Sequence, residues 1–133
     1  MKLTLLLFIA IVLVLFLAVI CRADTFTDEQ AIRAIIGEAS NQGFFGMKCV
    51  ACAIINRGTL KGVYGLHSKH IDKEPQWVWK MARKAYYDAK TGIPIHTGTH
   101  WENIKAFGTP YWVKNVKLVY EHKDHRFYKE VCL

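Results

Sequence analysis

The first candidate for chemistry is a glutamate near the end of an apolar helical stripe. Glu38 shares a helix face with Ala34 and Ile35, so its carboxyl group is expected to be partly desolvated, which favours the protonated form. Cleavage of a glycosidic bond needs such a group, because the leaving oxygen must receive a proton. Gly37 and Ala39 would leave space beside it for a bulky sugar. A solvated glutamate in the last helical turn is the alternative.

The second candidate is a segment that places a base, an aromatic ring, a carboxylate and an amide at four consecutive positions. Sugars suit such a set, because an aromatic face covers the apolar side of a pyranose while polar groups bind its hydroxyls. Ordinary aromatic packing in a loop is the alternative. The four residues are His100, Trp101, Glu102 and Asn103, and further aromatic residues follow at Phe107, Tyr111 and Trp112.

Six histidines offer a competing chemistry. They fall into pairs at spacings seen among metal ligands, and a pair with Glu102 or Asp124 would resemble a catalytic zinc site with an open position. The chain has no HExxH motif, and none of the pairs lies in a predicted helix. Surface or hydrogen-bonding histidines are the alternative. The pairs are His67/His70, His96/His100 and His122/His125.

Two helices are predicted around the first candidate. Thr27 can cap the first of them, and Gln30 can complete a capping box. Apolar residues then recur at helical spacing as far as Ala39, which places Glu38 in the last turn. A second helix fits residues 46–57, and the glycine that follows provides a stop.

The rest of the chain changes from helical to extended character. A third helix fits residues 75–90, with a proline suited to its first turn. Residues 58–74 are predicted to be a loop, and 96–110 a loop with short extended pieces. Apolar segments at 118–120 and 126–128 flank a polar turn, which is typical of a small β-hairpin. Helices followed by a short β element indicate an α+β fold that is mostly helical.

The N-terminus is predicted to be a targeting segment over residues 1–23. Lys2 precedes an apolar run over residues 3–21, and Ala23 is suited to the position before a cleavage site. The run also approaches the length of a membrane-spanning helix, so a cleaved signal and a retained anchor are both open. Either one makes 24–133 a single exported domain, periplasmic, extracellular or held at the outer face of the cytoplasmic membrane.

The charge of the chain indicates polyanionic partners. The formal net charge of +7 becomes +5 when Lys2 and Arg22 are removed with the targeting segment. Such a charge attracts nucleic acid, anionic lipid or cell-wall polymers. Export argues against nucleic acid, and the basic residues are scattered, so a solvated basic surface is the alternative.

The cysteines are expected to be structural. Cys49 and Cys52 have CxxC spacing, but no second pair completes a four-cysteine zinc site. Both fall inside the second predicted helix, where we favour two small buried residues. A disulfide from Cys132 to either of them is the alternative in an oxidising compartment.

Three motifs, spread over residues 30 to 128, together resemble a known family. The first is the Gly-Glu-Ala turn around Glu38, followed by an apolar helix that ends in Asn56-Arg57. The second is the segment from Thr99 to Asn103, and the third is His125-Arg126-Phe127-Tyr128. In order and spacing these motifs resemble the bacterial cell-wall hydrolase family that includes the spore-cortex-lytic enzymes.

The resemblance implies a lysozyme-like domain of the lytic transglycosylase type that needs no metal or cofactor. Its expected partner is peptidoglycan, which it would cut at the β-1,4 bond between N-acetylmuramic acid and N-acetylglucosamine. The catalytic glutamate of the family corresponds to Glu38. Glu102 stands where the family more often has an aromatic or polar residue. The groove wall is expected to include His100, Trp101, Asn103 and Tyr128.

The product depends on where Glu38 obtains its second proton. If the proton comes from the 6-hydroxyl of the muramic acid, a 1,6-anhydro ring forms and one carboxylate suffices. If it comes from water, the bond is hydrolysed, and Glu102 is the candidate for the second carboxylate that hydrolysis normally needs. We favour the transglycosylase route for a monomeric enzyme. A zinc-dependent amidase or endopeptidase and a non-catalytic wall-binding module are the alternatives.

Overall fold

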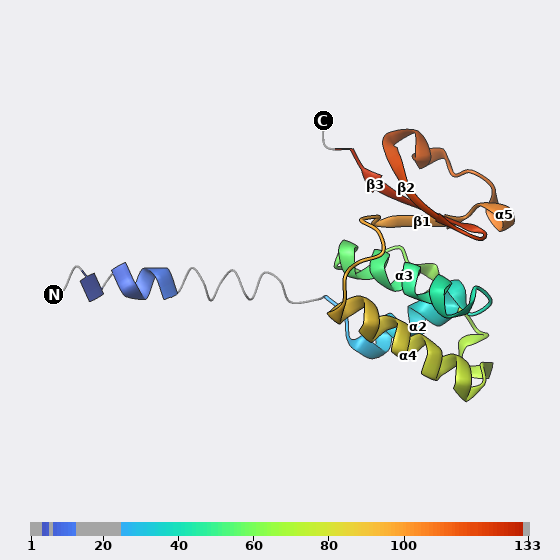
Figure 1. Cartoon of the computed structure of the whole chain (residues 1–133), viewed down its shortest axis with the longest axis horizontal. Coiled ribbons are helices and arrows are strands. Elements are labelled where there is room, and N and C mark those ends of the chain that lie inside the picture. Colours follow the sequence, from blue (N-terminus) through green and yellow to red (C-terminus); the bar gives the residue numbers. More distant parts are fainter. Residues whose placement is uncertain (1–3, 6, 13–24, 132–133) are drawn as a thin grey trace.

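The computed structural model describes residues 4–5, 7–12 and 25–131, and its main body has a helical layer beside a small sheet (Figure 1). The described chain is α+β and mostly helical, as predicted. The long helices are α2 (Asp28–Ala39), α3 (Gly43–Arg57) and α4 (Gln76–Thr91), and α5 (Ile104–Phe107) is short. The strands are β1 (His100–Asn103), β2 (Val116–His122) and β3 (His125–Glu130), and short 3-10 helices cover Tyr64–His67, Ile71–Lys73 and Tyr111–Asn115.

Most of the predicted targeting segment, including Ala23, lies outside the described residues. Residues 4–5 and 7–12 are helical. Within the part of the chain that the structure describes, no helix combines the length and the apolar character of a membrane span.

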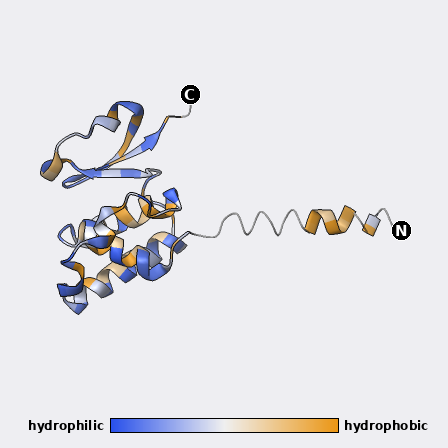
Figure 2. Cartoon of the chain, turned by 180° about the vertical axis from the view of Figure 1, so that it is seen from behind, coloured by the Kyte–Doolittle hydropathy of each residue, from blue (hydrophilic) through white to orange (hydrophobic). Residues whose placement is uncertain are grey.

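Helix α2 forms the centre of the core and begins as predicted. The Thr27 hydroxyl accepts the N–H of Gln30, and the Gln30 side chain accepts the N–H of Thr27, which completes the capping box. Ile32, Ile35 and Ile36 are fully buried. Figure 2 shows hydrophobic residues along all three long helices, and the buried ones belong to a single cluster. The helix therefore holds a rigid position from which its last turn can present Glu38.

Helix α3 starts three residues earlier than predicted and ends at the predicted glycine. Its N-cap residue, Gln42, makes no capping hydrogen bond through its side chain, so the sequence carries no clear start signal. Gly58 takes the left-handed conformation with φ 71°, which suits a residue without Cβ. Cys49 and Cys52 are free thiols buried in the core, as the packing interpretation predicted. Cys132 lies outside the described residues.

Helix α4 starts and ends one residue later than predicted and packs against both α2 and α3. Pro75 is the N-cap rather than a residue of the first turn, since its ψ of 156° is extended. Val78, Ala82 and Ala85 are buried on the face toward the other helices. The three helices thus bury a common core and leave the C-terminal end of α2 free to meet the rest of the chain.

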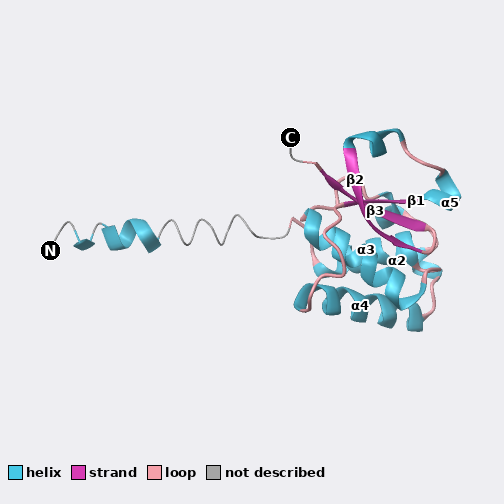
Figure 3. Cartoon of the chain, turned by 45° about the horizontal axis from the view of Figure 1, so that its top comes forward, coloured by secondary structure: helices cyan, strands magenta, loops and turns pink. Residues whose placement is uncertain are grey.

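The sheet has three strands, whereas the sequence indicated only a hairpin with short extended pieces before it. Strands β2 and β3 form the predicted hairpin, and β1 adds antiparallel to the other edge of β3, with Trp101 opposite Phe127. All four residues of β1 are half-buried, so no alternation of buried and exposed positions marks the strand. Figure 3 shows the sheet lying over α3. The third strand carries the polar and aromatic segment toward the helices.

The loop after α3 folds back onto α2. It was predicted only as a loop, but it contains the 3-10 helices Tyr64–His67 and Ile71–Lys73, and the first of them packs closely on α2. Arg33 of α2 donates to Asp72 at 2.8 Å and fixes the far end of this loop. The loop and β1 therefore approach α2 from two sides near Glu38.

Candidate functional site

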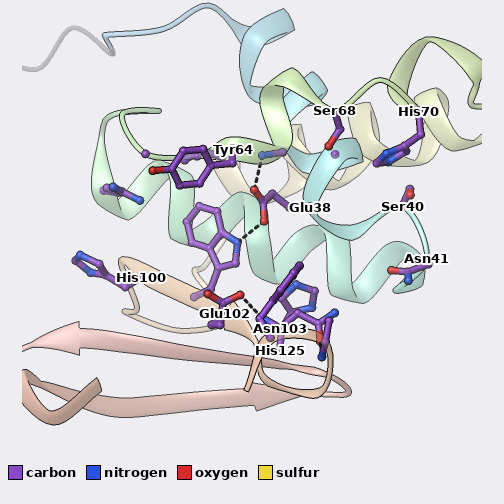
Figure 4. Close-up of a pocket in the computed structure, with 18 of the residues that line it drawn as sticks. Glu38, Ser40, Asn41, Tyr64, Ser68, His70, His100, Glu102, Asn103 and His125 are labelled. Carbon is purple, nitrogen blue, oxygen red and sulfur yellow. Dashed lines mark hydrogen bonds between the residues drawn. The ribbon is translucent and has the colours of Figure 1, made fainter. Parts of the chain in front are cut away.

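A hollow of about 840 Å³ opens where the end of α2, the following loop and the sheet meet (Figure 4). Its size is that of a site for a ligand of several rings. Both predicted carboxyl groups, Glu38 and Glu102, line it. The other side chains of the lining include Arg57, Tyr64, Ser68, His70, His100, Trp101, Asn103, Phe107, Trp112 and His125.

Glu38 is half-buried, and a separate N–H group donates to each of its carboxylate oxygens. The backbone N–H of Gly65 donates to Oε1 at 2.7 Å. The indole N–H of Trp101 donates to Oε2 at 3.2 Å. Figure 4 shows both bonds, which come from opposite walls of the hollow. The carboxylate is thus fixed in orientation by the loop on one side and by β1 on the other.

Two glycines allow the loop to come this close. A Cβ on Gly65 would lie 2.6 Å from both Cγ and Oε1 of Glu38, and a Cβ on Gly37 would lie 1.8 Å from the carbonyl oxygen of Gly65. The sequence assigned the small residues beside Glu38 to a bulky sugar, and that assignment is wrong. The backbone of Gly65 fills the space at Gly37, and Ala39 is fully buried in the core.

Glu102 reaches the hollow from the sheet. Its Oε1 accepts the backbone N–H of the next residue, Asn103, at 3.0 Å. Burial is the largest influence on this carboxyl group and raises its pKa; the bond from Asn103 acts in the opposite direction, and the negative charge of Glu38 adds to the rise. The two carboxyl groups are therefore close enough to influence one another across the hollow.

The structure brings three of the four predicted groove residues to the hollow and leaves the fourth behind it. His100, Trp101 and Asn103 line the hollow. The Asn103 side-chain oxygen is used locally, since it accepts the N–H of Ala106 and caps α5. Tyr128 is only 2 % exposed and lies behind Trp112, with ring centroids 5.3 Å apart.

The histidines divide into structural and site residues. His96 is buried; its Nε2 bonds the carbonyl of Cys49 at 2.8 Å and its Nδ1 accepts the N–H of Gly98, which locks one tautomer. His125 is 3 % exposed and lines the hollow, and burial lowers its pKa. Burial also lowers the pKa of His100, helped by the charge of Arg57. Across residues 4–5, 7–12 and 25–131, no three His, Cys, Asp or Glu side chains gather as metal ligands.

The contribution of the loop was missed at the level of sequence. Gly65 supplies the shorter of the two bonds to Glu38, and Tyr64 and Ser68 line the same wall. A glycine in a glycine-containing loop carries no signal of such a role. Of the aromatic residues expected nearby, Phe107 and Trp112 line the hollow, whereas Tyr111 is outside it and 85 % exposed.

The arrangement has the parts that glycan chemistry requires. It offers two carboxyl groups on facing walls, aromatic rings, and polar side chains within one open hollow. The chain matches no protein-family model, no curated protein and no solved structure, so the resemblance in the sequence rests on its three motifs alone.

Proposed function

We propose that this chain is an exported enzyme that cleaves the glycan strands of peptidoglycan at the β-1,4 bond between N-acetylmuramic acid and N-acetylglucosamine. Glu38 is the indispensable carboxylate. The proposal includes a lysozyme-like arrangement of the helices and sheet, a monomeric state, and delivery by residues 1–23 as a signal or an anchor.

The observation that carries the proposal is the bonding of Glu38. Its two oxygens accept N–H groups from the loop and from β1, and the carboxylate faces an open hollow rather than a core. A carboxylate whose orientation is fixed beside empty space suits proton transfer to a bound substrate, because the reacting groups need no reorganisation. A surface glutamate would have no reason to be held by two donors from distant parts of the chain.

The walls of the hollow suit a sugar polymer. The indole of Trp101 and the rings of Tyr64, Phe107 and Trp112 supply faces for the apolar sides of pyranose rings. The side chains of Ser68 and His100 supply groups that bind hydroxyls. An opening of this volume accommodates more than one sugar, as cleavage within a strand requires.

The chemistry follows from the stability of the glycosidic bond. Its oxygen leaves only when protonated, and C1 of the muramic acid then becomes oxocarbenium-like, which a nearby carboxylate stabilises. A carboxyl group must supply the proton and a carboxylate must receive one from the attacking hydroxyl. Two routes satisfy these requirements. Either Glu38 does both and the 6-hydroxyl of the same sugar attacks to give a 1,6-anhydro end, or Glu38 and Glu102 divide the two proton transfers and water attacks.

The proposal is tested by digesting purified peptidoglycan with the protein, with and without a metal chelator, and identifying the soluble fragments by mass spectrometry. We expect glycan fragments that end in muramic acid, released equally with the chelator. Free stem peptides with intact glycan, released only without the chelator, would replace the proposal by a zinc-dependent amidase. Binding to the polymer with no release would leave a wall-binding module.

A further inference from the structure

The two carboxyl groups of the hollow differ in how they are bonded. Glu38 accepts one N–H on each oxygen, from Gly65 at 2.7 Å and from Trp101 at 3.2 Å. Two donors on two oxygens match an ionised carboxylate, which is an acceptor at both positions. Glu102 accepts one N–H, from its own neighbour Asn103, on Oε1 alone. Its Oε2 is therefore the oxygen that can carry a proton toward a ligand.

The surroundings increase this difference. Burial and the charge of Glu38 both raise the pKa of Glu102, against the bond from Asn103. The other ionisable groups around the hollow do not remove this difference between Glu38 and Glu102. His100 and His125 have lowered pKa values, so both are neutral at pH 7, and Arg57 of α3 is the permanent cation. Tyr64 and His70 complete the ionisable lining.

Facing carboxyl groups in unlike environments divide the roles of acid and base. Figure 4 shows Glu38 entering the hollow from the helical side and Glu102 from the sheet side. A bound glycan would lie between them, with its leaving oxygen toward one and the attacking hydroxyl toward the other. Hydrolysis through two carboxyl groups uses such a pair, with one group on each side of the scissile bond.

We propose that Glu102 donates the proton to the leaving oxygen and that Glu38 is the carboxylate base that activates water. The inference rests on the proposed glycan cleavage and specifies its mechanism. It reverses the expectation that Glu38 is the acid, and it makes the chain a muramidase.

The proton of Glu102 moves to the glycosidic oxygen as the C1–O bond breaks, and the bonding electron pair stays on that oxygen, which becomes the 4-hydroxyl of N-acetylglucosamine. Water forms the new bond to C1 and gives one proton to Glu38. The muramic acid leaves with a free C1 hydroxyl, and the two side chains recover their starting states by proton exchange with solvent.

The test compares Glu38→Gln and Glu102→Gln on two substrates. One is purified peptidoglycan. The other is an aryl β-glycoside of the disaccharide that has N-acetylmuramic acid at its reducing end, and the phenolate leaving group of this substrate needs no protonation. For Glu102→Gln we expect a loss of about 10²-fold or more in rate on peptidoglycan and less than about 10-fold on the aryl glycoside. For Glu38→Gln we expect both activities to be lost. Glu29→Gln, an exposed carboxylate on α2 that does not line the hollow, is the control and should change neither.

The outcomes separate this inference from the proposed function. The assignment of Glu102 as the acid and Glu38 as the base would be overturned by either of two results. One is that Glu38→Gln keeps the aryl-glycoside activity, and the other is that Glu102→Gln keeps full activity on peptidoglycan. Neither result would contradict the proposed cleavage of glycan strands. Anhydro ends in the wild-type digest would overturn the assignment as well, and reducing ends support it. If the wild-type protein releases no glycan fragments, the proposed function itself fails. Cooperative thermal melting of both variants near the wild-type temperature shows that their folds are intact.

The pH dependence provides a further readout. Glu102 must be protonated to act as the acid. The enzyme should therefore cleave peptidoglycan at pH values below the raised pKa of Glu102 and lose this activity as the pH rises through that pKa. We expect kcat/KM on peptidoglycan to fall on the alkaline side, and hydrolysis of the aryl glycoside to lack that fall. An alkaline fall shared by both substrates would contradict the assignment.

Discussion

Helix α2 has a hydrogen-bonded carboxylate near each terminus, and the two carboxylates differ in their surroundings. At the N-terminus, Asp28 accepts bonds from Tyr86 at 2.7 Å, Tyr87 at 3.0 Å and Lys90 at 2.8 Å, all side chains of α4. At the C-terminus, Glu38 accepts a backbone N–H and an indole N–H beside an open hollow. The first arrangement joins two helices, and the second fixes a carboxylate that, in the proposed function, acts on a ligand.

The difference lies in what surrounds each carboxylate. The donors of Asp28 include a cation, which neutralises its charge, and the bond from Lys90 is the largest cause that lowers its pKa to about 2. No cation pairs with Glu38 among the ion pairs of the described chain. Its charge is held in place and left without compensation, which suits a developing positive charge at C1 of a sugar. We therefore expect changes at Asp28 to alter stability and changes at Glu38 to alter activity.

The largest effect is expected from Glu38→Gln. The amide keeps nearly the same shape but can neither donate nor accept the proton, so peptidoglycan cleavage should fall by about 10³-fold. Only the oxygen of the amide can accept an N–H, so one of the two bonds to this side chain is lost, and the free energy of unfolding should fall by about 1 kcal/mol. The matched control is Glu29→Gln, an exposed residue of the same helix, which should keep full activity.

The next effect is expected from Gly65→Ala. The added methyl group would lie 2.6 Å from the Glu38 carboxyl group, so the loop or the side chain must move. A displacement of about 1 Å at a catalytic group lowers activity by about 10²-fold. Crowding of this kind also destabilises by about 1–3 kcal/mol. Gly58→Ala is less suitable as a control because that residue has a positive φ, whereas Lys69→Ala changes an exposed residue of the same loop that does not line the hollow. Equal activity losses in Gly65→Ala and Lys69→Ala would contradict a specific role for Gly65.

A smaller effect is expected from Trp101→Phe, which keeps an aromatic ring and removes the N–H bonded to Glu38. The loss of one such bond corresponds to about 1 kcal/mol, or about 5-fold to 10-fold in rate. The change should appear in kcat more than in KM if the bond orients the carboxylate. A rise in KM with unchanged kcat would instead make Trp101 only a sugar-binding surface.

The smallest effect on activity is expected from Asp28→Asn, which should leave cleavage unchanged and lower stability. Because the native pKa of Asp28 lies below its ordinary value of 3.8, its contribution is present above about pH 4 and is lost as the pH falls toward 2. The side chain is 40 % exposed, so solvent screening limits the contribution to about 1 kcal/mol. The gap between the melting temperatures of wild type and variant should close from pH 4 to pH 2. A constant gap would contradict the assignment of this pKa.

Features that depend on residues close together in the chain could be predicted from the sequence, and contacts between distant residues could not. The capping box at Thr27, the stop at Gly58 and the β2–β3 hairpin all rest on residues close together in the chain. The partners of Glu38 do not, since Gly65 lies 27 positions away and Trp101 lies 63 positions away. Tyr128 was expected in the groove from its motif, but pairing of β3 with β1 turns its ring behind Trp112.

The role of β1 shows the same limit. Its residues could be identified from the sequence as candidates for binding or catalysis, because four polar or aromatic side chains follow one another. That they form a strand depends on the backbone of β3, which offers a free edge, and no alternation within His100–Asn103 signals it. The residue types of the candidate site could therefore be identified from the sequence, whereas their arrangement in space depends on tertiary packing.

The most direct test measures binding and cleavage of purified peptidoglycan by the wild-type protein and by Glu38→Gln in parallel. We expect both proteins to sediment with the polymer and only the wild type to release glycan fragments that end in muramic acid. Release of the same fragments by Glu38→Gln at a rate near that of the wild type would contradict the central claim that Glu38 performs the reaction.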